Sequence, residues 1–244
     1  MDFVSAKVNS LVVHSNLLKS GFVPNEEKSL WEPVQITTWL GVILNTIDET
    51  VKATNECIEK LNTSLVELSS CPPPRKVHVR NVAGATGQII SLSSCVGSVA
   101  RIMTRFLFSV VNSARYWDND AFLSDESLSE INFWKNNEVS LNGKVCWSPQ
   151  SLPVKVTFSD ASNSACGAFV ENSNLVFLQD WSPAESAQSS TWRELKAVSL
   201  ALEAFASHFR GFKVIWYTDN QNVESIILSG SRKADLHQLA LRVF

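Results

Sequence analysis

Three acidic residues in the last third of the chain stand where carboxylates commonly do chemistry. Asp160 ends a stretch that alternates apolar and polar residues, and Asp219 ends an almost continuously apolar stretch, as strands do. Glu194 lies in the first turns of a long amphipathic segment. Open sheets bind ligands beyond the carboxyl ends of their strands, so Asp160 and Asp219 are expected to share one sheet edge. A helix that crosses this edge would bring Glu194 beside them.

A cluster of three carboxylates favours metal-dependent chemistry on phosphate esters. The acids repel one another unless cations neutralise them, and magnesium prefers carboxylates together with water and phosphate. A pair of such ions about 4 Å apart activates a water molecule and stabilises the leaving oxygen in phosphodiester cleavage. Taken singly, each acid also fits a structural role, because an acid after a strand is often a turn residue and an acid early in a helix complements the helix dipole.

The elements that must position these acids follow Pro153, where the pattern of the sequence changes. Strands are predicted over residues 154–159, 165–170, 175–179 and 212–217, a long helix over 189–209, and short helices over 222–228 and 235–244. This order of strands and helices predicts a mixed sheet with helices packed against it. The strand at 212–217 is almost continuously apolar, which predicts that both its faces are buried.

The first 150 residues are predicted to be mainly helical. In residues 1–50, the patterns indicate the end of a helix at 10–18, a turn at 20–25 and a strand or hairpin at 35–44. Further along, they indicate helices at 51–68, 85–115 and 127–136, a turn at 142–143 and a linker at 148–153. Three successive prolines at 72–74 prevent the helix at 51–68 from continuing. Gly97 is a candidate point of division in the segment 85–115.

The composition excludes several classes of protein. The chain has 244 residues, 45% of them hydrophobic and 18% charged, which suits one large or two small globular domains and excludes a disordered, collagen-like or coiled-coil protein. Its five cysteines form no CxxC pair, which argues against a disulfide framework and against a zinc site. The apolar runs fall short of the roughly 18 residues needed to span a bilayer, and no secretory signal is recognisable. The expectation is an intracellular protein without a membrane partner.

The charged residues are unevenly distributed along the chain. The net charge of −3 does not indicate a basic nucleic-acid binder. However, residues 68–117 carry six positive side chains and no acid, whereas residues 118–130 carry five acids and no positive side chain. A basic helical segment can face phosphates, with Arg101 and Arg105 as its candidate substrate contacts. Scattered charges on a solvated surface explain the same pattern, and both alternatives stay open.

Around the three acids, residues 159–162 (SDAS), 191–195 (TWREL) and 217–220 (YTDN) resemble the first three catalytic motifs of ribonuclease H domains in retrotransposon polyproteins, in particular the DIRS-like group. In that group the ribonuclease H follows a reverse transcriptase. Residues 21–22, 25–29 and 39–41 are similar to the end of the reverse-transcriptase palm, including the LG turn of the primer-grip region. The resemblance implies a palm end at 1–45, a thumb/connection-like helical segment at 46–150 and a C-terminally incomplete ribonuclease H-like domain at 151–244.

The resemblance also implies a fold and an activity. The fold would be α/β, with a ribonuclease H-like mixed sheet and flanking helices, preceded by a mainly helical reverse-transcriptase thumb/connection segment. Asp160, Glu194 and Asp219 would be catalytic and bind two magnesium ions, with manganese as a substitute, to cleave the RNA strand of an RNA–DNA hybrid. Ser162 and Asn220 would lie beside that site, within reach of the nucleic acid. The implied partners are the hybrid and the rest of the polyprotein, in cytoplasm or nucleus.

The sequence departs from the pattern of this family in several places. It has no YxDD-like pair of polymerase aspartates, so this chain alone is not expected to synthesise DNA. The family's fourth metal-binding aspartate follows the last strand of the sheet; the sequence ends before reaching it, and Asp235 falls too early. Ala165 and Cys166 stand where the family often has glycine and tryptophan. His208 and His237 do not match the mobile histidine of some ribonucleases H and are expected to be surface or packing residues.

Two other functions compete with the enzyme. A catalytically inactive remnant would bind hybrid or tRNA-like nucleic acid through residues 68–117 without cleaving it, with a salt dependence set by several phosphate contacts. An inert structural or interaction domain would keep the fold and have no affinity for nucleic acid. The absent fourth ligand favours the remnant. The three intact carboxylates argue against both alternatives, because a copy without chemistry has no need of three mutually repelling acids.

Overall fold

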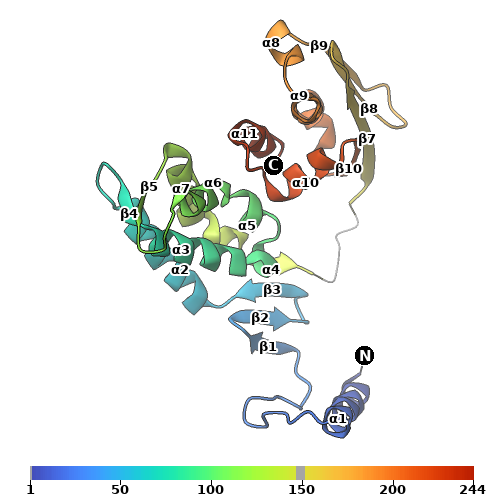
Figure 1. Cartoon of the computed structure of the whole chain (residues 1–244). Helices are drawn as coiled ribbons and strands as arrows, with labels where there is room; N and C mark the ends of the chain where they lie inside the picture. Colours follow the sequence, from blue (N-terminus) through green and yellow to red (C-terminus); the bar gives the residue numbers. More distant parts are fainter. Residues whose placement is uncertain (1, 147–151) are drawn as a thin grey trace.

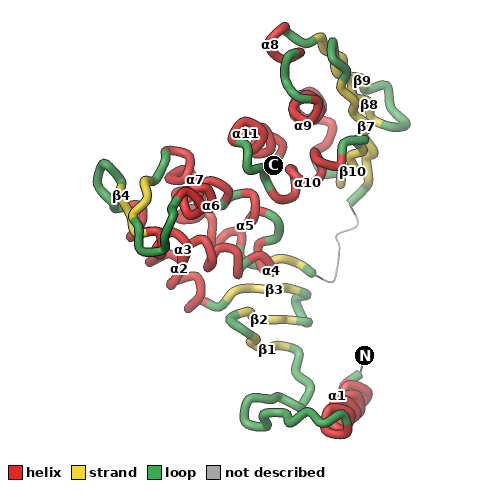
Figure 2. Tube along the Cα trace, in the orientation of Figure 1, coloured by secondary structure: helices red, strands yellow, loops and turns green. Residues whose placement is uncertain are grey.

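The computed structural model describes residues 2–146 and 152–244, which form three successive parts (Figure 1). An N-terminal helix lies apart from the rest, a small sheet and a group of helices follow it, and a second sheet with its own helices ends the chain (Figures 1 and 2). The linker predicted over 148–153 lies almost entirely outside the described residues. Within those residues, no helix combines the length and the apolar character needed to cross a membrane.

The N-terminal helix α1 (Phe3–Lys19) is anchored by the loop that follows it. Asp2 caps the helix, because its Oδ1 accepts a hydrogen bond from the Ser5 amide at 2.8 Å. The ring of His14 packs edge-on against the ring of Trp31, with 4.4 Å between their centroids. None of the residues in α1 is buried, so this helix leaves its apolar side chains largely exposed to solvent.

The first sheet is antiparallel and has the strand order β1-β2-β3-β6. Its strands are β1 (Ile36–Trp39), β2 (Val42–Asn45), β3 (Thr50–Ala53) and β6 (Lys144–Val145). A two-residue turn joins β1 to β2, with φ of 49° at Leu40 and 79° at Gly41. Positive φ at both positions is the conformation of a type I′ hairpin, so of the strand or hairpin predicted over 35–44 the structure contains the hairpin.

The helices of the middle part surround one apolar core. They are α2 (Asn55–Ser69), α3 (Val79–Ser91), α4 (Ser93–Val96), α5 (Val99–Ile102), α6 (Arg105–Ser113) and α7 (Asp125–Leu141). Leu61, Leu65, Ile89 and Trp134 are fully buried in this core. The helical stretch begins at residue 79 rather than 85, and α7 extends beyond both predicted ends at 127 and 136. Gly97, with φ of 78°, ends α4 and so divides the segment as predicted, but breaks at Leu92 and at 103–104 make four helices of it rather than two.

The helix predicted over 51–68 is wrong at its start, because residues 50–53 form strand β3. Val51 and Ala53 are buried and Lys52 between them is exposed, as in a half-buried strand. Helix α2 begins only after Thr54, whose hydroxyl oxygen accepts a hydrogen bond from the Cys57 amide and caps the helix. A stretch of four residues is too short for the periods of strand and helix to be told apart in the sequence.

Replacing Gly41 by alanine is expected to destabilise the protein. An added Cβ would lie 2.7 Å from Cys57 Sγ, and the φ of 79° disfavours any side chain. We expect a loss of about 1–2 kcal/mol in the free energy of unfolding, measured by urea denaturation. Gly87→Ala is the matched control: Gly87 lies within α3 with nothing within 4 Å of an added Cβ, so alanine should stabilise there by up to ~1 kcal/mol. Equal effects of the two substitutions would contradict this interpretation.

The acidic stretch that follows residues 68–117 neutralises part of their positive charge. Strands β4 (Lys76–His78) and β5 (Asp120–Phe122) pair antiparallel and bring the two stretches together. The resulting ion pairs are Arg75–Asp125, Lys76–Asp120 and Arg80–Asp118. Within the described residues, Arg101, Arg105 and Arg115 are left without an ion pair. Acids of the following stretch therefore neutralise half of the six positive side chains.

The second sheet has the strand order β10-β7-β8-β9, in which β10 runs parallel to β7 and the other pairs are antiparallel. Its strands are β7 (Val154–Ala161), β8 (Ala165–Val170), β9 (Val176–Asp180) and β10 (Lys213–Tyr217). The helices are α8 (Pro183–Ser186), α9 (Ser190–Phe209), α10 (Gln221–Ser229) and α11 (Ala234–Val243). The predicted α/β class, a mixed sheet with flanking helices, is confirmed.

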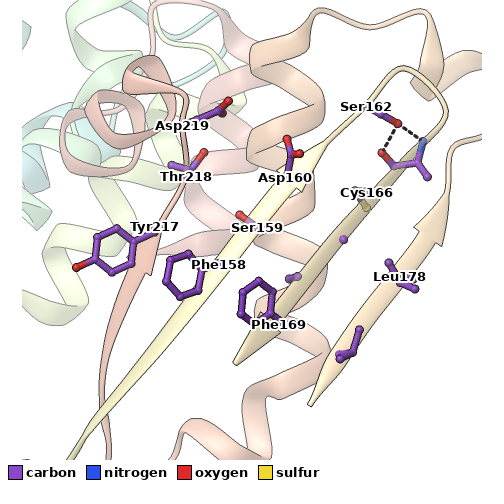
Figure 3. Close-up of a pocket in the computed structure, with 14 residues that line it drawn as sticks. Phe158, Ser159, Asp160, Ser162, Cys166, Phe169, Leu178, Tyr217, Thr218 and Asp219 are labelled. Carbon is purple, nitrogen blue, oxygen red and sulfur yellow. Dashed lines mark hydrogen bonds between the residues drawn. The ribbon is translucent and has the colours of Figure 1, made fainter. Parts of the chain in front are cut away.

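Helix α9 covers one face of this sheet, and the other face is open (Figures 1 and 3). Ala201 and Phe205 of α9 are buried together with Ala168 and Val170 of β8. The predicted burial of both faces of the strand at 212–217 is wrong. β10 is an edge strand of the described sheet, and Tyr217 at its end is 53% exposed. An apolar strand thus occurs at an open face, which its composition alone does not reveal.

The middle and C-terminal parts of the chain share a buried contact. Ile102 of α5 is fully buried in a cluster with Val223 of α10 and Leu239 of α11. The ring of His237 is also buried and lies edge-on to the ring of Phe106, with 4.9 Å between centroids. His237 is therefore a packing residue, and His208 is exposed, which confirms the prediction for both histidines.

Candidate metal centre

Asp160, Glu194 and Asp219 each place a carboxylate oxygen in a cluster whose atoms all lie within 4.8 Å of one another. The register of β10 with β7 brings two of them together, because it aligns Tyr217 with Phe158, and each acid stands two residues further along its chain. The labelled side chains of Asp160 and Asp219 lie at the same end of the sheet in Figure 3. The proximity predicted from the strand ends is thus confirmed.

Helix α9 contributes the third carboxylate from the covered face of the sheet. The helix begins after Ser189, whose Oγ accepts a hydrogen bond from the Trp192 amide at 3.2 Å. Glu194 follows in the second turn, and its Oε1 accepts a hydrogen bond from the Ala161 amide at 3.1 Å. Its Oε2 is buried and has no hydrogen-bond partner among the described residues. One oxygen is thus fixed by the backbone, while the other lacks a partner.

The surroundings of Glu194 favour a bound cation. This side chain is 5% exposed, and burial raises its pKa from 4.5 to about 7. The Ala161 amide opposes the increase, whereas the charges of Asp160 and Asp219 add to it. A buried carboxylate oxygen without a partner, next to two exposed carboxylates, is an unfavourable arrangement that a cation relieves. Three hard oxygen ligands fit a divalent metal ion.

Arg193, which no sequence pattern indicated, ties together two loops near the carboxylates. Its Nη1 donates hydrogen bonds to the carbonyl oxygens of Ser186 and Gln188, both at 2.7 Å. Its Nη2 donates to Oδ1 of Asn163 in the turn between β7 and β8. The buried guanidinium therefore positions the start of α9, and with it Glu194, against this turn. The sequence shows only an arginine next to Glu194, and this does not distinguish a buried arginine that positions the helix from a solvated one.

Ser162 and Asn220 lie beside the cluster but have structural hydrogen-bond partners. The Oγ of Ser162 accepts from the amides of Ser164 and Ala165, at 3.1 and 3.0 Å, and closes the turn between β7 and β8 (Figure 3). Asn220 caps α10, because its Oδ1 accepts from the Asn222 amide at 3.0 Å. Ser162 lines the groove with Asp160 and Asp219, Asn220 directly follows Asp219 in the chain, and a role of either residue in binding nucleic acid stays a prediction.

Arg101 and Arg105 are not part of this centre. A groove of about 890 Å³ contains Asp160 and Asp219, and neither arginine is among the described residues that line it. Arg105 instead donates a hydrogen bond from Nε to the carbonyl oxygen of Ser229, at the other end of α10. A contact between these arginines and the substrate would therefore require a nucleic acid that extends beyond the carboxylates.

The groove next to the carboxylates continues over the open face of the sheet (Figure 3). The ring of Phe158 stacks between the rings of Phe169 and Tyr217, at centroid distances of 5.0 and 5.1 Å. Cys166 also lines the groove, but burial raises the pKa of its thiol to about 11. The thiol is therefore protonated at neutral pH and is a poor nucleophile. The carboxylates are the groups that give this groove its chemistry.

Comparisons with known proteins show a distant structural likeness. No protein-family model and no curated protein matches the chain. The foamy viral protease-reverse transcriptase in complex with RNA/DNA hybrid aligns with 100% of this chain and 32% of its own, at 14% identity and a TM-score of 0.44. The foamy viral protease-reverse transcriptase dRH in complex with ds DNA aligns with 98% and 41%, at 14% identity and a TM-score of 0.42. The chain spans less than half the length of these proteins, and its site is interpreted from its own geometry.

Proposed function

We propose that this chain hydrolyses the RNA strand of RNA–DNA hybrids in a metal-dependent endonucleolytic reaction, as part of a retrotransposon reverse transcriptase. The observation that carries the proposal is the cluster of Asp160, Glu194 and Asp219, whose oxygens lie within 4.8 Å of one another at the ends of two parallel strands. The observed order is three strands, a short helix, a long helix, a further strand and two helices, which is the order predicted from the sequence pattern with the short helix α8 added.

The proposal extends to the organisation of the whole chain. Residues 1–45 would be the end of the palm, residues 46–150 the thumb/connection-like segment and residues 151–244 the ribonuclease H-like domain. The type I′ turn at 40–41 would be the LG turn of the primer-grip region. The assignment to the DIRS-like group rests on the three sequence motifs alone.

The residues of the cluster fit magnesium, with manganese as a substitute. All three side chains offer hard oxygen ligands, and the buried Oε2 of Glu194 has no other partner in the described structure. Asp160, Glu194 and Asp219 together would hold the two proposed ions. The chemistry that this metal supplies when bound is Lewis-acid activation of water and neutralisation of charge at the scissile phosphate.

The protein's own groups determine where that chemistry takes place. The Ala161 amide holds Oε1 of Glu194 and leaves Oε2 available to the cluster. Because Asp160 and Asp219 are exposed, they are accessible to a substrate phosphate from the solvent side. The turn closed by Ser162 borders the same groove and limits where the substrate backbone can lie.

Replacing Asp160 by asparagine is expected to abolish cleavage of the RNA strand in a labelled RNA–DNA hybrid. Loss of an outer-shell partner of a metal ligand costs roughly 10–100-fold in activity, so loss of a ligand should cost at least about 100-fold. The measurement compares initial rates with magnesium, with manganese and with chelator. Asp180→Asn, at the end of β9 and outside the cluster, is the matched control and should cleave like the unchanged protein. Equal rates for Asp160→Asn and the unchanged protein would overturn the proposal.

The competing hypothesis is a catalytically inactive remnant with a nucleic-acid-binding or structural role. Residues 68–117 would form its binding surface, and three of their six positive side chains are engaged in ion pairs. This weakens the segment as a phosphate-binding surface, whereas the intact carboxylate cluster favours the enzyme. Binding of the hybrid without metal-dependent cutting of its RNA strand would establish the remnant instead.

A further inference from the structure

A second groove, of about 650 Å³, is lined by residues of α6 and of the loop that joins α10 to α11. Figure 1 shows where these helices lie in the fold. The lining residues are Arg105, Phe108, Ser109 and Asn112 from α6 and Ser231 and Arg232 from the loop. The α6 residues have the spacing i, i+3, i+4 and i+7, so they share one face of the helix. The groove therefore gathers two guanidinium groups, two hydroxyls and an amide from two distant parts of the sequence.

The side chain of Arg105 is held in place by the loop. Its Nε donates a hydrogen bond to the carbonyl oxygen of Ser229. Its stem approaches Gly230, which has φ of 73°: an added Cβ there would lie 2.6 Å from Arg105 Cγ and 2.9 Å from His237 Nδ1. An arginine that is already ordered in this way loses little further conformational freedom when it binds a ligand.

Arg105 and Arg232 lie in this groove without an ion-pair partner among the described residues. Burial lowers the pKa of Arg105, and the positive charge of Arg232 lowers it further. The negative charge of Glu130 raises the pKa of Arg105. However, the hydrogen-bond partners of this carboxylate are the amides of Phe106 and Leu107, at 3.0 and 2.9 Å, and not Arg105. An anion in the groove would relieve the repulsion between the two guanidinium groups.

We propose that this groove binds a phosphate group, and that this phosphate belongs to the backbone of the nucleic-acid substrate; the second statement rests on the proposed function. Guanidinium groups bind phosphate oxygens through paired, charge-assisted hydrogen bonds. Serine and asparagine side chains are frequent additional contacts to nucleic-acid backbones. The lining of the groove supplies both kinds of donor on the rigid face of a helix and on the loop opposite.

The position of the groove indicates which phosphate it would take. Helix α10 begins two residues after Asp219 and ends at Ser229, beside the groove. A helix of nine residues is ~14 Å long, and successive phosphates of one strand are about 3.4 Å apart along a duplex. The bound phosphate would therefore lie about four nucleotides from the phosphate at the carboxylates. This spacing agrees with a substrate that extends beyond the metal centre.

Replacing Arg232 by glutamine tests this proposal, because the side chain is exposed and its loss should leave the fold intact. The affinity of the full chain for a hybrid of about 20 base pairs, or two helical turns, is measured by fluorescence anisotropy at several salt concentrations. Chelator in the buffer prevents cleavage, so the result does not depend on enzymatic activity. We expect roughly tenfold weaker binding and a salt slope reduced by about 0.9, the contribution of one phosphate contact. Arg210→Gln, an exposed arginine outside the groove, should bind like the unchanged protein.

Thermal unfolding with inorganic phosphate distinguishes a backbone phosphate from a free one. One outcome is that phosphate raises the Tm of the unchanged protein but not that of Arg232→Gln, while the two proteins bind the hybrid with equal salt slopes. The groove would then be a site for free phosphate, and its assignment to the nucleic-acid backbone would be overturned. If neither measurement separates the two proteins, the groove is not a phosphate site. A third outcome is that Arg232→Gln has a reduced salt slope but the unchanged protein does not cleave the hybrid in magnesium. This would support the groove as a phosphate site and overturn the proposed function.

Discussion

Replacing Glu194 by glutamine is expected to make the metal-free protein more stable at about pH 8. The pKa of Glu194 is about 7 in the folded protein, where burial is the main cause, against an ordinary value of 4.5. Between these two values the folded protein binds a proton that the unfolded chain has released, so the free energy of unfolding falls as the pH rises through this window. Above pH 7 the loss is complete and amounts to roughly 3 kcal/mol. Glutamine carries no charge and avoids this loss.

The measurement is urea denaturation in chelator at about pH 5 and about pH 8. At each pH, the free energy of unfolding of the unchanged protein is compared with that of Glu194→Gln. The difference isolates the contribution of the one carboxyl from the other groups that titrate. Glu203→Gln, an exposed position of the same helix, is the matched control and should follow the unchanged protein at both pH values. If Glu194→Gln also follows the unchanged protein, the carboxyl is not buried in the way described above.

The same substitution is expected to remove the response to magnesium. A proton and a metal ion compete for the Glu194 carboxylate, so magnesium should raise the Tm of the unchanged protein more at about pH 8 than at about pH 6. In Glu194→Gln we expect no magnesium-dependent rise in Tm and no cleavage of the hybrid. A variant that gains stability and still responds to magnesium would show that the metal binds elsewhere.

Replacing Glu130 by alanine is expected to lower the free energy of unfolding by about 4 kcal/mol. Glu130 is 2% exposed, and its two oxygens accept hydrogen bonds from the Phe106 and Leu107 amides at the start of α6. Its Oε1 also lies 3.8 Å from Nε2 of the buried His237. Alanine would leave the two amides without partners, at roughly 1–3 kcal/mol each, and would open a cavity between α6, α7 and α11.

Two further variants make this prediction specific. Glu126→Ala removes an exposed glutamate from the same helix, α7, and should change the stability by less than about 0.5 kcal/mol. Glu130→Gln retains one oxygen acceptor and the side-chain shape, so its stability should lie between those of Glu130→Ala and the unchanged protein. Urea denaturation of all three variants is the measurement. A loss for Glu130→Ala no larger than that for Glu126→Ala would show that the start of α6 is stabilised by other groups.

The elements of the C-terminal part could be predicted because their signals are local. Alternation over a few residues indicated the strand at 154–159, which lies within β7, and helical periodicity indicated the helix at 189–209, which differs from α9 by one residue. The proximity of Asp160 and Asp219 could also be predicted, because each follows a strand and parallel strands end at one edge. Where the signal was too short, at residues 50–53, the prediction failed.

The environment of each site residue depended on contacts between segments that are far apart in the sequence. The crossing of α9 over β7 decides which oxygen of Glu194 receives the Ala161 amide and which is left without a partner in the described structure. The pairing of β4 with β5 neutralises three positive side chains that the sequence shows as unbalanced. Arg105 meets Ser229 across 124 positions of sequence and so forms a groove with Arg232. The spacing of apolar residues along the sequence indicates which face of a helix or strand is apolar. The counter-charges and hydrogen-bond partners of a side chain depend on which surfaces meet when the whole core packs.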